Sequence, residues 1–334
     1  MGIQSIRAAW YEKQGDARDV IQYSEISVSE PSPGEVRVRV HASGVNPSDT
    51  KVRGGWGGIS VKFPRIIPHQ DGAGIIESVG EDVPTSRIGE RVWIYEAQQG
   101  RPFGTAAEYV VVPSHQAIYL PDNTSFAEGA CLGVPAMTAH RCVFADGSVN
   151  GQVILVTGGA GAVGNYAVQF AKWGGATVIT TVSRPEQVEL AKAAGADHII
   201  NYKTEDVVQR IREITGKERG LNRIIDVDFN ANLYITDAVL RTNGVVAMYA
   251  ADPDVRPAVP IVSLMLRNIT IRTVLVYTMP SEAKQAATRD IVAALEAGAL
   301  RHNIARRFPL TDVAAAHEAQ DSGQMIGKAI IEIA

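Results

Sequence analysis

One stretch, Val153–Gly164 (V-I-L-V-T-G-G-A-G-A-V-G), constrains the fold of this chain more than any other. Its first five residues are β-branched or leucine, a pattern typical of a parallel strand buried on both faces. Glycines then follow with the spacing G-x-G-x-x-G, where a helical pattern begins. Such glycines permit a tight turn, close approach of the backbone to a pyrophosphate, and close helix packing. The stretch predicts a dinucleotide-binding turn made of Gly159, Ala160, Gly161, Ala162, Val163 and Gly164.

The residues after the turn support this interpretation over an ordinary strand-to-helix turn. Apolar residues recur at helical spacing through 165–173, and Gly174 and Gly175 end the predicted helix. Residues 176–182 (A-T-V-I-T-T-V) then predict a second buried strand. Together they form a β-α-β unit of about 30 residues, the length that this motif requires. A helix that starts at the turn would offer free N–H groups and partial positive charge to phosphates.

The remainder of the chain changes character near residue 125. The earlier part predicts many short strands with regular turns, which favours a compact barrel-like domain. Its residues 53–58 (R-G-G-W-G-G) predict an irregular loop. The later part alternates helical and strand patterns, the mark of a doubly wound α/β sheet. Helices are expected at 126–144 (two in succession), 185–194, 205–215, 233–240, 286–297 and 314–320, with Ser183 as an N-cap.

Length and composition exclude several classes of protein. A chain of 334 residues suggests two domains, and its net charge of −4 leaves no basic footprint for nucleic acid or an anionic membrane. No apolar run approaches the roughly 18 residues that span a bilayer, and the N-terminus lacks a signal-peptide pattern. Cys131 and Cys142 are expected to be structural thiols in a reducing compartment, which points to the cytoplasm.

Short motifs run in a fixed order from about residue 34 to the C-terminus. They are 44–49 (G-V-N-P-S-D), 72–74 (G-A-G), 89–92 (G-E-R-V), 107–109 (A-E-Y), the glycine turn, 195–197 (G-A-D) and 327–328 (G-K). The ordered set resembles the medium-chain dehydrogenase/reductase family, in particular its zeta-crystallin-like quinone oxidoreductase branch. The resemblance implies an α/β fold with a doubly wound parallel Rossmann sheet at 127–277, inserted into a GroES-like β-barrel domain at 1–126 plus 278–334. It also implies an active cleft between them.

The zinc ligands of the family's alcohol dehydrogenases are missing from the matching positions. This sequence has Asn46, Gln70 and Val134 there, and neither an amide nor a valine is a good Zn²⁺ ligand. The four-cysteine lobe is also absent between Trp93 and Tyr109. We therefore expect no metal. Without a Lewis acid, the natural small-molecule acceptor is one already activated by conjugation, such as a quinone or an enone.

The end of the second predicted strand favours NADP(H) over NAD(H). An NAD enzyme would carry an acid there, but residues 180–185 read T-T-V-S-R-P. Ser183 can donate to a 2′-phosphate and Arg184 can pair with it; the less favoured alternative for Arg184 is a solvated arginine at a helix start. The resemblance adds Tyr202 near the same phosphate, Thr138 near the nicotinamide ribose and Lys328 near the cofactor phosphates.

Three residues are candidates for handling the acceptor. The Asn46 amide can donate a hydrogen bond to an acceptor oxygen as hydride arrives. Lys51 stands where quinone oxidoreductases commonly carry a tyrosine, and with Arg53 beside it could favour oxygen-rich or anionic quinones. The alternative for Lys51 is a side chain that points to solvent.

Two other functions stay open at this stage. The same cofactor and cleft would serve an NADPH-dependent reductase of α,β-unsaturated aldehydes or ketones. The resemblance also admits a crystallin-like structural or RNA-binding protein, although the acidic net charge disfavours nucleic acid. Residues 268–277 (N-I-T-I-R-T-V-L-V-Y) are β-rich and poor in charge, so an exposed edge there predicts a homodimer, with a tetramer also possible. The alternative is that the barrel domain covers this edge.

Overall fold

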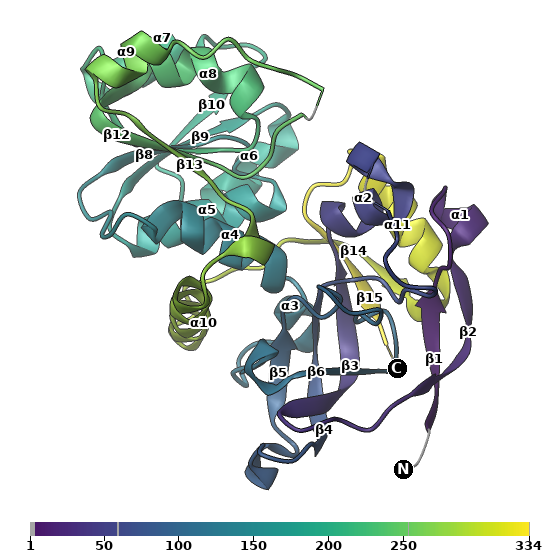
Figure 1. The fold of residues 1–334 in the computed structure, drawn as a ribbon. Coiled ribbons are helices and arrows are strands. Elements are labelled where there is room, and N and C mark those ends of the chain that lie inside the picture. The colour runs from purple at the N-terminus through teal and green to yellow at the C-terminus, as the bar shows by residue number, and fades with distance from the viewer. Residues whose placement is uncertain (1–3, 59, 253, 334) are drawn as a thin grey trace. The chain divides into compact units, whose positions relative to one another are not determined.

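The structure is a computed structural model that describes residues 4–58, 60–252 and 254–333 (Figure 1). Its described residues form two compact units: unit 1 contains 4–134, 290–298 and 302–333, and unit 2 contains 135–289 and 299–301. The boundaries expected from the sequence, 1–126 plus 278–334 and 127–277, differ from these units and stay a prediction of the functional domains.

Unit 2 is built around a parallel sheet. Its strand order is β10-β9-β8-β11-β12-β13, and every neighbouring pair is parallel. This order reverses between β8 and β11, as it does in dinucleotide-binding folds. The strands are β8 (Val153–Val156), β9 (Thr177–Val182), β10 (His198–Asn201), β11 (Leu221–Asp226), β12 (Leu240–Met248) and β13 (Thr270–Thr273). The predicted doubly wound sheet is confirmed.

Helices cover both faces of this sheet (Figure 1). α5 and α6 pack on β8, β9 and β10, whereas α7 and α8 lie on the other face against β10, β11 and β12. Ile211, Phe229 and Leu233 are buried between the second pair of helices and the sheet. The helices in this part of the chain are α4 (Gly133–Phe144), α5 (Ala162–Trp173), α6 (Pro185–Ala193), α7 (Val207–Thr215), α8 (Phe229–Val239), α9 (Ile261–Leu266) and α10 (Ser281–Glu296), of which α10 continues into unit 1 from residue 290.

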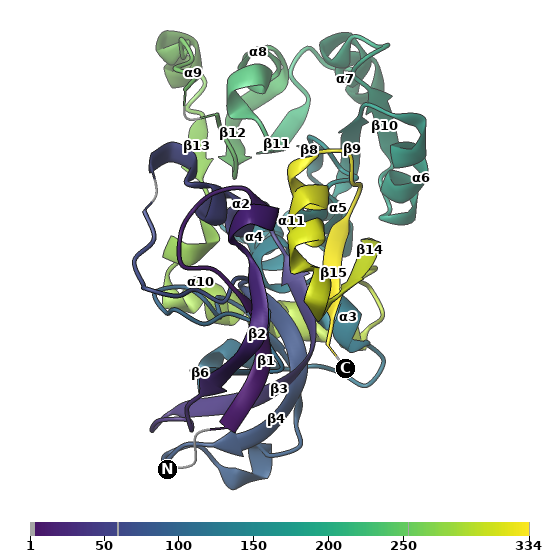
Figure 2. The same ribbon diagram turned by 90° about the vertical axis from the view of Figure 1, so that its right-hand side faces the viewer.

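Unit 1 is mainly antiparallel β-structure, in which β1 and β2 form a separate pair (Figure 2). The other described strands form one sheet in the order β14-β15-β3-β4-β5-β7, with β6 also paired to β3. Val36, Val38 and Val40 are at most 2% exposed, because residues two apart on β3 share its core face. The strands are β1 (Gln4–Trp10), β2 (Gln22–Val28), β3 (Glu35–Val45), β4 (Asp71–Val79), β5 (Arg91–Ile94), β6 (Tyr109–Pro113), β7 (Ala117–Tyr119), β14 (Ile304–Pro309) and β15 (Lys328–Glu332).

Short helices accompany the sheet of unit 1. They are α1 (Ala17–Val20), α2 (Pro47–Gly54), α3 (Phe126–Gly129) and α11 (Val313–Asp321). The prediction of an irregular loop at 53–58 is wrong in part, because α2 extends to Gly54 and a 3₁₀ turn covers Trp56–Gly58. The reason is local. Gly55 has φ +74° and caps the C-terminus of α2, so a glycine ends the helix here rather than preventing it.

The stretch at 268–277 is less extended than its β-rich sequence suggests. Only Thr270–Thr273 forms a strand, and a 3₁₀ turn follows at Val276–Thr278. The strand does lie at the edge of the sheet of unit 2. No helix in the described part of the chain is long and apolar enough to cross a membrane.

Candidate active-site residues in the two units

The glycine turn connects β8 to α5 at the carboxyl edge of the unit 2 sheet, beside the point where the strand order reverses. A Cβ added to Gly159 would lie 2.0 Å from Thr180 Oγ1, and one added to Gly164 would lie 2.3 Å from the Gly158 oxygen. These two glycines are therefore required by the packing of the protein on itself.

Gly161 has a different explanation. Its φ of −72° suits any residue, and a Cβ there would meet only the Gly158 oxygen, at 3.4 Å. Neither the backbone conformation nor the packing of the protein requires a glycine at this position. A pyrophosphate that approaches the helix N-terminus closely would require one, because a side chain would stand in its way. The turn of Gly159, Ala160, Gly161, Ala162, Val163 and Gly164 thus fits a dinucleotide.

Threonines of β9 hold this turn, and the sequence patterns did not single them out. Thr181 Oγ1 accepts a hydrogen bond from the Gly158 N–H at 3.1 Å, and the Thr181 carbonyl accepts one from Gly159 at 3.2 Å. Thr180 Oγ1 donates to the Val156 carbonyl at 2.7 Å. The sequence signal that could have identified them is a pair of threonines in the strand that follows the glycine turn and its helix.

The ends of β9 and β10 bring together the residues expected at a 2′-phosphate. Val182 pairs with Asn201, and the Tyr202 N–H donates to the Val182 carbonyl at 3.1 Å, so Tyr202 follows β10 at the edge where Ser183 follows β9. The Arg184 side chain is 39% exposed, with Nε 3.8 Å from a Glu186 carboxylate oxygen. Lys203, which the sequence patterns missed, adds a second cation, with Nζ 5.2 Å from the centre of the Tyr202 ring.

The prediction that Ser183 is the N-cap of α6 is wrong, because Arg184 occupies that position. The cause is Gln187, whose Oε1 accepts from the Ser183 N–H at 2.7 Å, the Ser183 hydroxyl at 3.1 Å and the Arg184 N–H at 3.1 Å. Pro185 also makes Arg184 the last residue outside the helix. The Ser183 hydroxyl hydrogen is therefore engaged by Gln187.

Asp226, at the end of β11, is a buried acid that sequence reasoning missed. Its Oδ1 accepts from Thr157 Oγ1 at 2.9 Å, the Asp228 N–H at 3.0 Å and Asn232 Nδ2 at 2.7 Å, while Oδ2 is buried without a hydrogen-bond partner among the described residues. Burial raises the pKa of Asp226. The sequence signal that could have identified Asp226 is an acid at the end of a strand where the strand order reverses.

Thr138, which the resemblance placed near the nicotinamide ribose, lies on α4 and is buried.

In unit 1, three strands converge on a buried polar cluster of Asn46, Asp71 and Lys328. Asn46 follows β3, while Asp71 and Lys328 begin β4 and β15, which both pair with β3. Asn46 Nδ2 donates to Asp71 Oδ2 at 2.8 Å, and Lys328 Nζ donates to the same oxygen at 2.9 Å and to Asn46 Oδ1. The three side chains are 2%, 0% and 3% exposed.

This geometry determines how the Asn46 amide points. Lysine has only donors, so Oδ1 must face Lys328, and Nδ2 then faces the two carboxyl groups, giving one hydrogen to Asp71 and interacting with Asp49 as well. The resemblance implied a place near the cofactor phosphates for Lys328. Its Nζ contacts Asn46 and Asp71, and a role toward the cofactor stays a prediction. Asp71, an acid inside an apolar stretch, was missed.

A second carboxyl group supports the backbone of this cluster. Asp49 Oδ2 accepts from the Asn46 N–H at 2.7 Å and thereby closes the first turn of α2. Burial, together with the nearby Asp71 charge, raises the pKa of Asp49 to about 7. The protonation state of a group beside Asn46 therefore changes near neutral pH.

A chain of buried hydrogen bonds ends on the backbone of Asp71. Thr105 Oγ1 donates to the Asp71 carbonyl at 2.6 Å, so it must accept from Ser43 Oγ, 2.7 Å away. Ser43 Oγ in turn accepts from His69 Nδ1 at 2.8 Å. Burial lowers the pKa of His69, so its neutral ring accepts at Nε2 from His317 Nε2 at 2.9 Å. The chain runs in one direction and positions the start of β4.

A zinc ion does not fit these residues. Gln70 exchanges two hydrogen bonds with Gln98, at 3.1 and 3.3 Å, and Val134 offers its N–H to Asp71 Oδ1 at 2.9 Å. The buried Lys328 ammonium beside Asn46 would repel a second cation. Among the described residues, no three His, Cys, Asp or Glu side chains form a metal-binding group.

Lys51 and Arg53 lie on α2 but have different surroundings. Lys51 is exposed, with Nζ 4.3 Å from the centre of the Trp56 ring. Arg53 is 4% exposed and donates to the Gly15 carbonyl and to Asp321 Oδ2, both at 2.5 Å. Asp321 compensates the Arg53 charge, so the structure gives Arg53 a role in holding α2 and does not bring it to the Asn46 cluster.

Two family models match the chain: zinc-binding dehydrogenase over residues 162–293 and alcohol dehydrogenase GroES-like domain over residues 32–122. A quinone oxidoreductase of Sus scrofa is 30% identical over 88% of each chain, and a 2-haloacrylate reductase of Burkholderia sp. is 30% identical over 98% of each. The solved structure of a mycobacterial protein complexed with NADPH has a TM-score of 0.82 and 25% identity, covering 98% of this chain and 99% of that chain. The chain therefore belongs to the quinone oxidoreductase branch of the medium-chain dehydrogenase/reductase family of oxidoreductases.

Proposed function

We propose that this protein transfers hydride from NADPH to a quinone-type conjugated carbonyl without zinc. The observation that carries the proposal is the orientation of the Asn46 amide, which Lys328 and Asp71 hold from both ends. Bound NADPH supplies the hydride. Negative charge grows on the acceptor oxygen as hydride arrives, and a donor already aimed at that oxygen stabilises the transition state.

The residues of the cluster divide this work. The Nδ2 hydrogen of Asn46 that is not given to Asp71 turns from Asp49 to the acceptor oxygen when the acceptor binds. Lys328 pulls electron density toward Asn46 Oδ1, which makes the Nδ2 hydrogens better donors, and Asp71 compensates the lysine charge. Lys51 places a positive charge at the surface of α2, which would favour anionic acceptors over neutral ones.

NADP(H) is the proposed cofactor. The fold alone does not choose between NAD(H) and NADP(H), but the end of β9 carries Ser183 and Arg184 and no acid. Tyr202 and Lys203 follow the neighbouring strand β10. A 2′-phosphate at this edge would therefore meet the cations of Arg184 and Lys203, and it would not meet an acid at the end of β9. The mycobacterial relative complexed with NADPH supports the same choice.

Reduction of an α,β-unsaturated carbonyl compound at carbon is a second candidate. The observation in its favour is the 30% identity with a 2-haloacrylate reductase over 98% of both chains. The same Asn46 donor would stabilise the negative oxygen that forms when hydride adds to the conjugated carbon. Rates with a quinone panel and an enone panel, measured by NADPH consumption, separate the two candidates.

The Asn46→Ala variant tests the proposal. We expect kcat/KM for quinone to fall about ten-fold or more, because one transition-state hydrogen bond is worth about 1–3 kcal/mol. The dissociation constant for NADPH should hardly change. Asn123→Ala is a matched control, since it also removes a side-chain amide from unit 1, one that donates to the Leu295 carbonyl at 2.9 Å. Turnover of Asn46→Ala at the parent rate would show that the site is elsewhere.

We also propose a homodimer, with a tetramer as the larger alternative, that works in the cytoplasm. Support for pairing comes from the edge position of β13 and from α9, where Ile261, Val262, Met265 and Leu266 are each more than 60% exposed. Support for a reducing compartment comes from Cys131 and Cys142, which are buried and not in a disulfide.

A further inference from the structure

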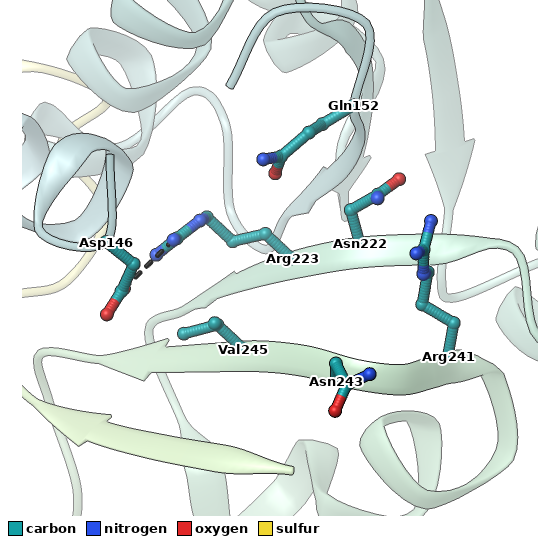
Figure 3. Close-up of a pocket in the computed structure, with 7 residues that line it drawn as sticks. All are labelled: Asp146, Gln152, Asn222, Arg223, Arg241, Asn243 and Val245. Atoms are coloured by element: carbon teal, nitrogen blue, oxygen red, sulfur yellow. Dashed lines mark hydrogen bonds and ion pairs between the residues drawn. The ribbon is translucent and has the colours of Figure 1, made fainter. Parts of the chain in front are cut away.

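A pocket of about 290 Å³ opens at the amino edge of the unit 2 sheet, the edge opposite the glycine turn. It originates in the pairing of β11 with β12. Leu221 pairs with Leu240 and Arg223 with Val245, so Arg241 to Gly244 all lie opposite Asn222. Figure 3 shows the residues that line the pocket, which are Asp146, Gln152, Asn222, Arg223, Arg241, Asn243 and Val245.

The amide side chains of this pocket have donors to offer. Asn222 Oδ1 accepts from the Val153 N–H at 3.0 Å, and Asn243 Oδ1 accepts from Asn268 Nδ2 at 2.8 Å. The oxygen of each amide is thus bound within the protein, which leaves the amino groups of Asn222 and Asn243 for a ligand. Gln152 uses one Nε2 hydrogen on the Ser148 carbonyl, at 3.0 Å, and retains the other.

The charge of the pocket is positive. Arg223 is 2% exposed and binds the Cys142 carbonyl at 2.8 Å and Asp146 Oδ2 at 2.9 Å, while its Nε is buried without a partner among the described residues. Asp146 also binds Arg272, so one carboxylate serves two guanidinium groups. Arg241 adds a further cation and has no ion pair in the described part of the chain.

Asn243 shows that the backbone at this pocket is strained. Its φ is +59°, in the left-handed region that favours glycine, although the residue lies inside β12. Asparagine adopts this conformation more readily than most non-glycine residues, which allows an amide side chain at this bend. The irregular pairing thus places an amide side chain in the lining of the positive pocket.

We propose that this pocket binds a small oxyanion, a phosphate or a carboxylate group, through Arg241 and the amino groups of Asn222 and Asn243. The volume of about 290 Å³ is several times the volume that one liquid water occupies, about 30 Å³, so the pocket has room for a small anion. The site is independent of the proposed function, because it lies at the sheet edge opposite the dinucleotide turn.

The test is calorimetric titration of the purified protein with inorganic phosphate and, separately, with citrate at matched ionic strength. We expect Arg241→Gln to weaken binding about ten-fold or more, since a charge-assisted hydrogen bond is lost. Arg256→Gln is the control, because it removes an exposed arginine of unit 2 outside the pocket and should change binding less than two-fold. Phosphate bound at the glycine turn would persist in Arg241→Gln, which separates the two sites.

Asn243→Gly provides a second variant that should fold well. It removes an amide donor and relieves the positive φ, so we expect weaker anion binding with an unchanged or higher unfolding midpoint. Binding of phosphate alone or of citrate alone would support the site and identify its ligand class. Absence of binding for both anions, or equal affinities of Arg241→Gln and Arg256→Gln, would overturn the proposal.

Discussion

The contact between Lys328 and Asp71 predicts a large and non-additive loss of stability when its charges are removed. Lys328 Nζ and Asp71 Oδ2 are 2.9 Å apart, and the two side chains are 4% and 0% exposed. With an effective dielectric constant of about 20, unit charges at this distance attract by about 6 kcal/mol. Lys328→Met leaves Asp71 buried with hydrogen bonds from Asn46 and Val134 but with no cation. We expect the free energy of unfolding to fall by about 3–5 kcal/mol.

Asp71→Asn should cost a similar amount, because it leaves Lys328 buried without an opposite charge. The double variant Lys328→Met/Asp71→Asn buries no unpaired charge, so its loss should be smaller than the sum of the single losses by at least about 2 kcal/mol. The matched control is Arg307→Gln, from an ion pair with Glu332 on neighbouring strands whose side chains are 50% and 55% exposed. Its effect should stay below about 1 kcal/mol.

Urea unfolding of the parent and the four variants, followed by tryptophan fluorescence and extrapolated linearly to water, measures these free energies. Trp93, fully buried in unit 1, is a suitable reporter. Lys328→Met also releases Asn46 Oδ1, so kcat for quinone should fall together with stability, and Lys328→Arg should restore part of both. Additive losses in the double variant, or a Lys328→Met loss no larger than that of Arg307→Gln, would refute the reasoning.

Four further predictions concern the cofactor, pH, metal and assembly. Arg184→Ala should raise KM for NADPH roughly ten- to hundred-fold and leave NADH kinetics nearly unchanged, and equal changes for both cofactors would contradict the assignment. The pKa of Asp49 is raised to about 7 in the folded protein, compared with about 3.9 in the unfolded chain. The folded protein therefore binds this proton more tightly, which stabilises the fold by about 4 kcal/mol below pH 4. This stabilisation is lost as the pH rises from 4 to 7. Asp49→Asn should abolish that part of the pH dependence in urea unfolding. Elemental analysis should find well under one zinc per chain, and chelators should not inhibit. Light scattering at micromolar concentration should give a dimer mass, and a monomer mass would exclude pairing through β13.

Local sequence determined the nucleotide-binding half of the protein. The apolar run of β8, the glycines after it and the amphipathic α5 are adjacent in the chain, so their period and turn chemistry are readable without a partner. The missing acid after β9 is local in the same way. Local reasoning was wrong where glycines were taken to exclude regular structure at 53–58, because Gly55 ends α2.

Tertiary structure alone decided the cluster of Asn46, Asp71 and Lys328 and the pocket at the amino edge of the unit 2 sheet. Lys328 lies 282 residues from Asn46 and 257 from Asp71, and His69 lies 248 from His317. Asn46, Asp71 and Lys328 meet because β15 and β4 both pair with β3, in a register set by the apolar faces of the sheet and not by the polar residues themselves. His317 reaches His69 from α11, which packs on β3 and β15. The pocket likewise arises from a register shift between β11 and β12. Period and turns are encoded locally, whereas contacts between charges on different strands depend on a register that exists only after the core has formed.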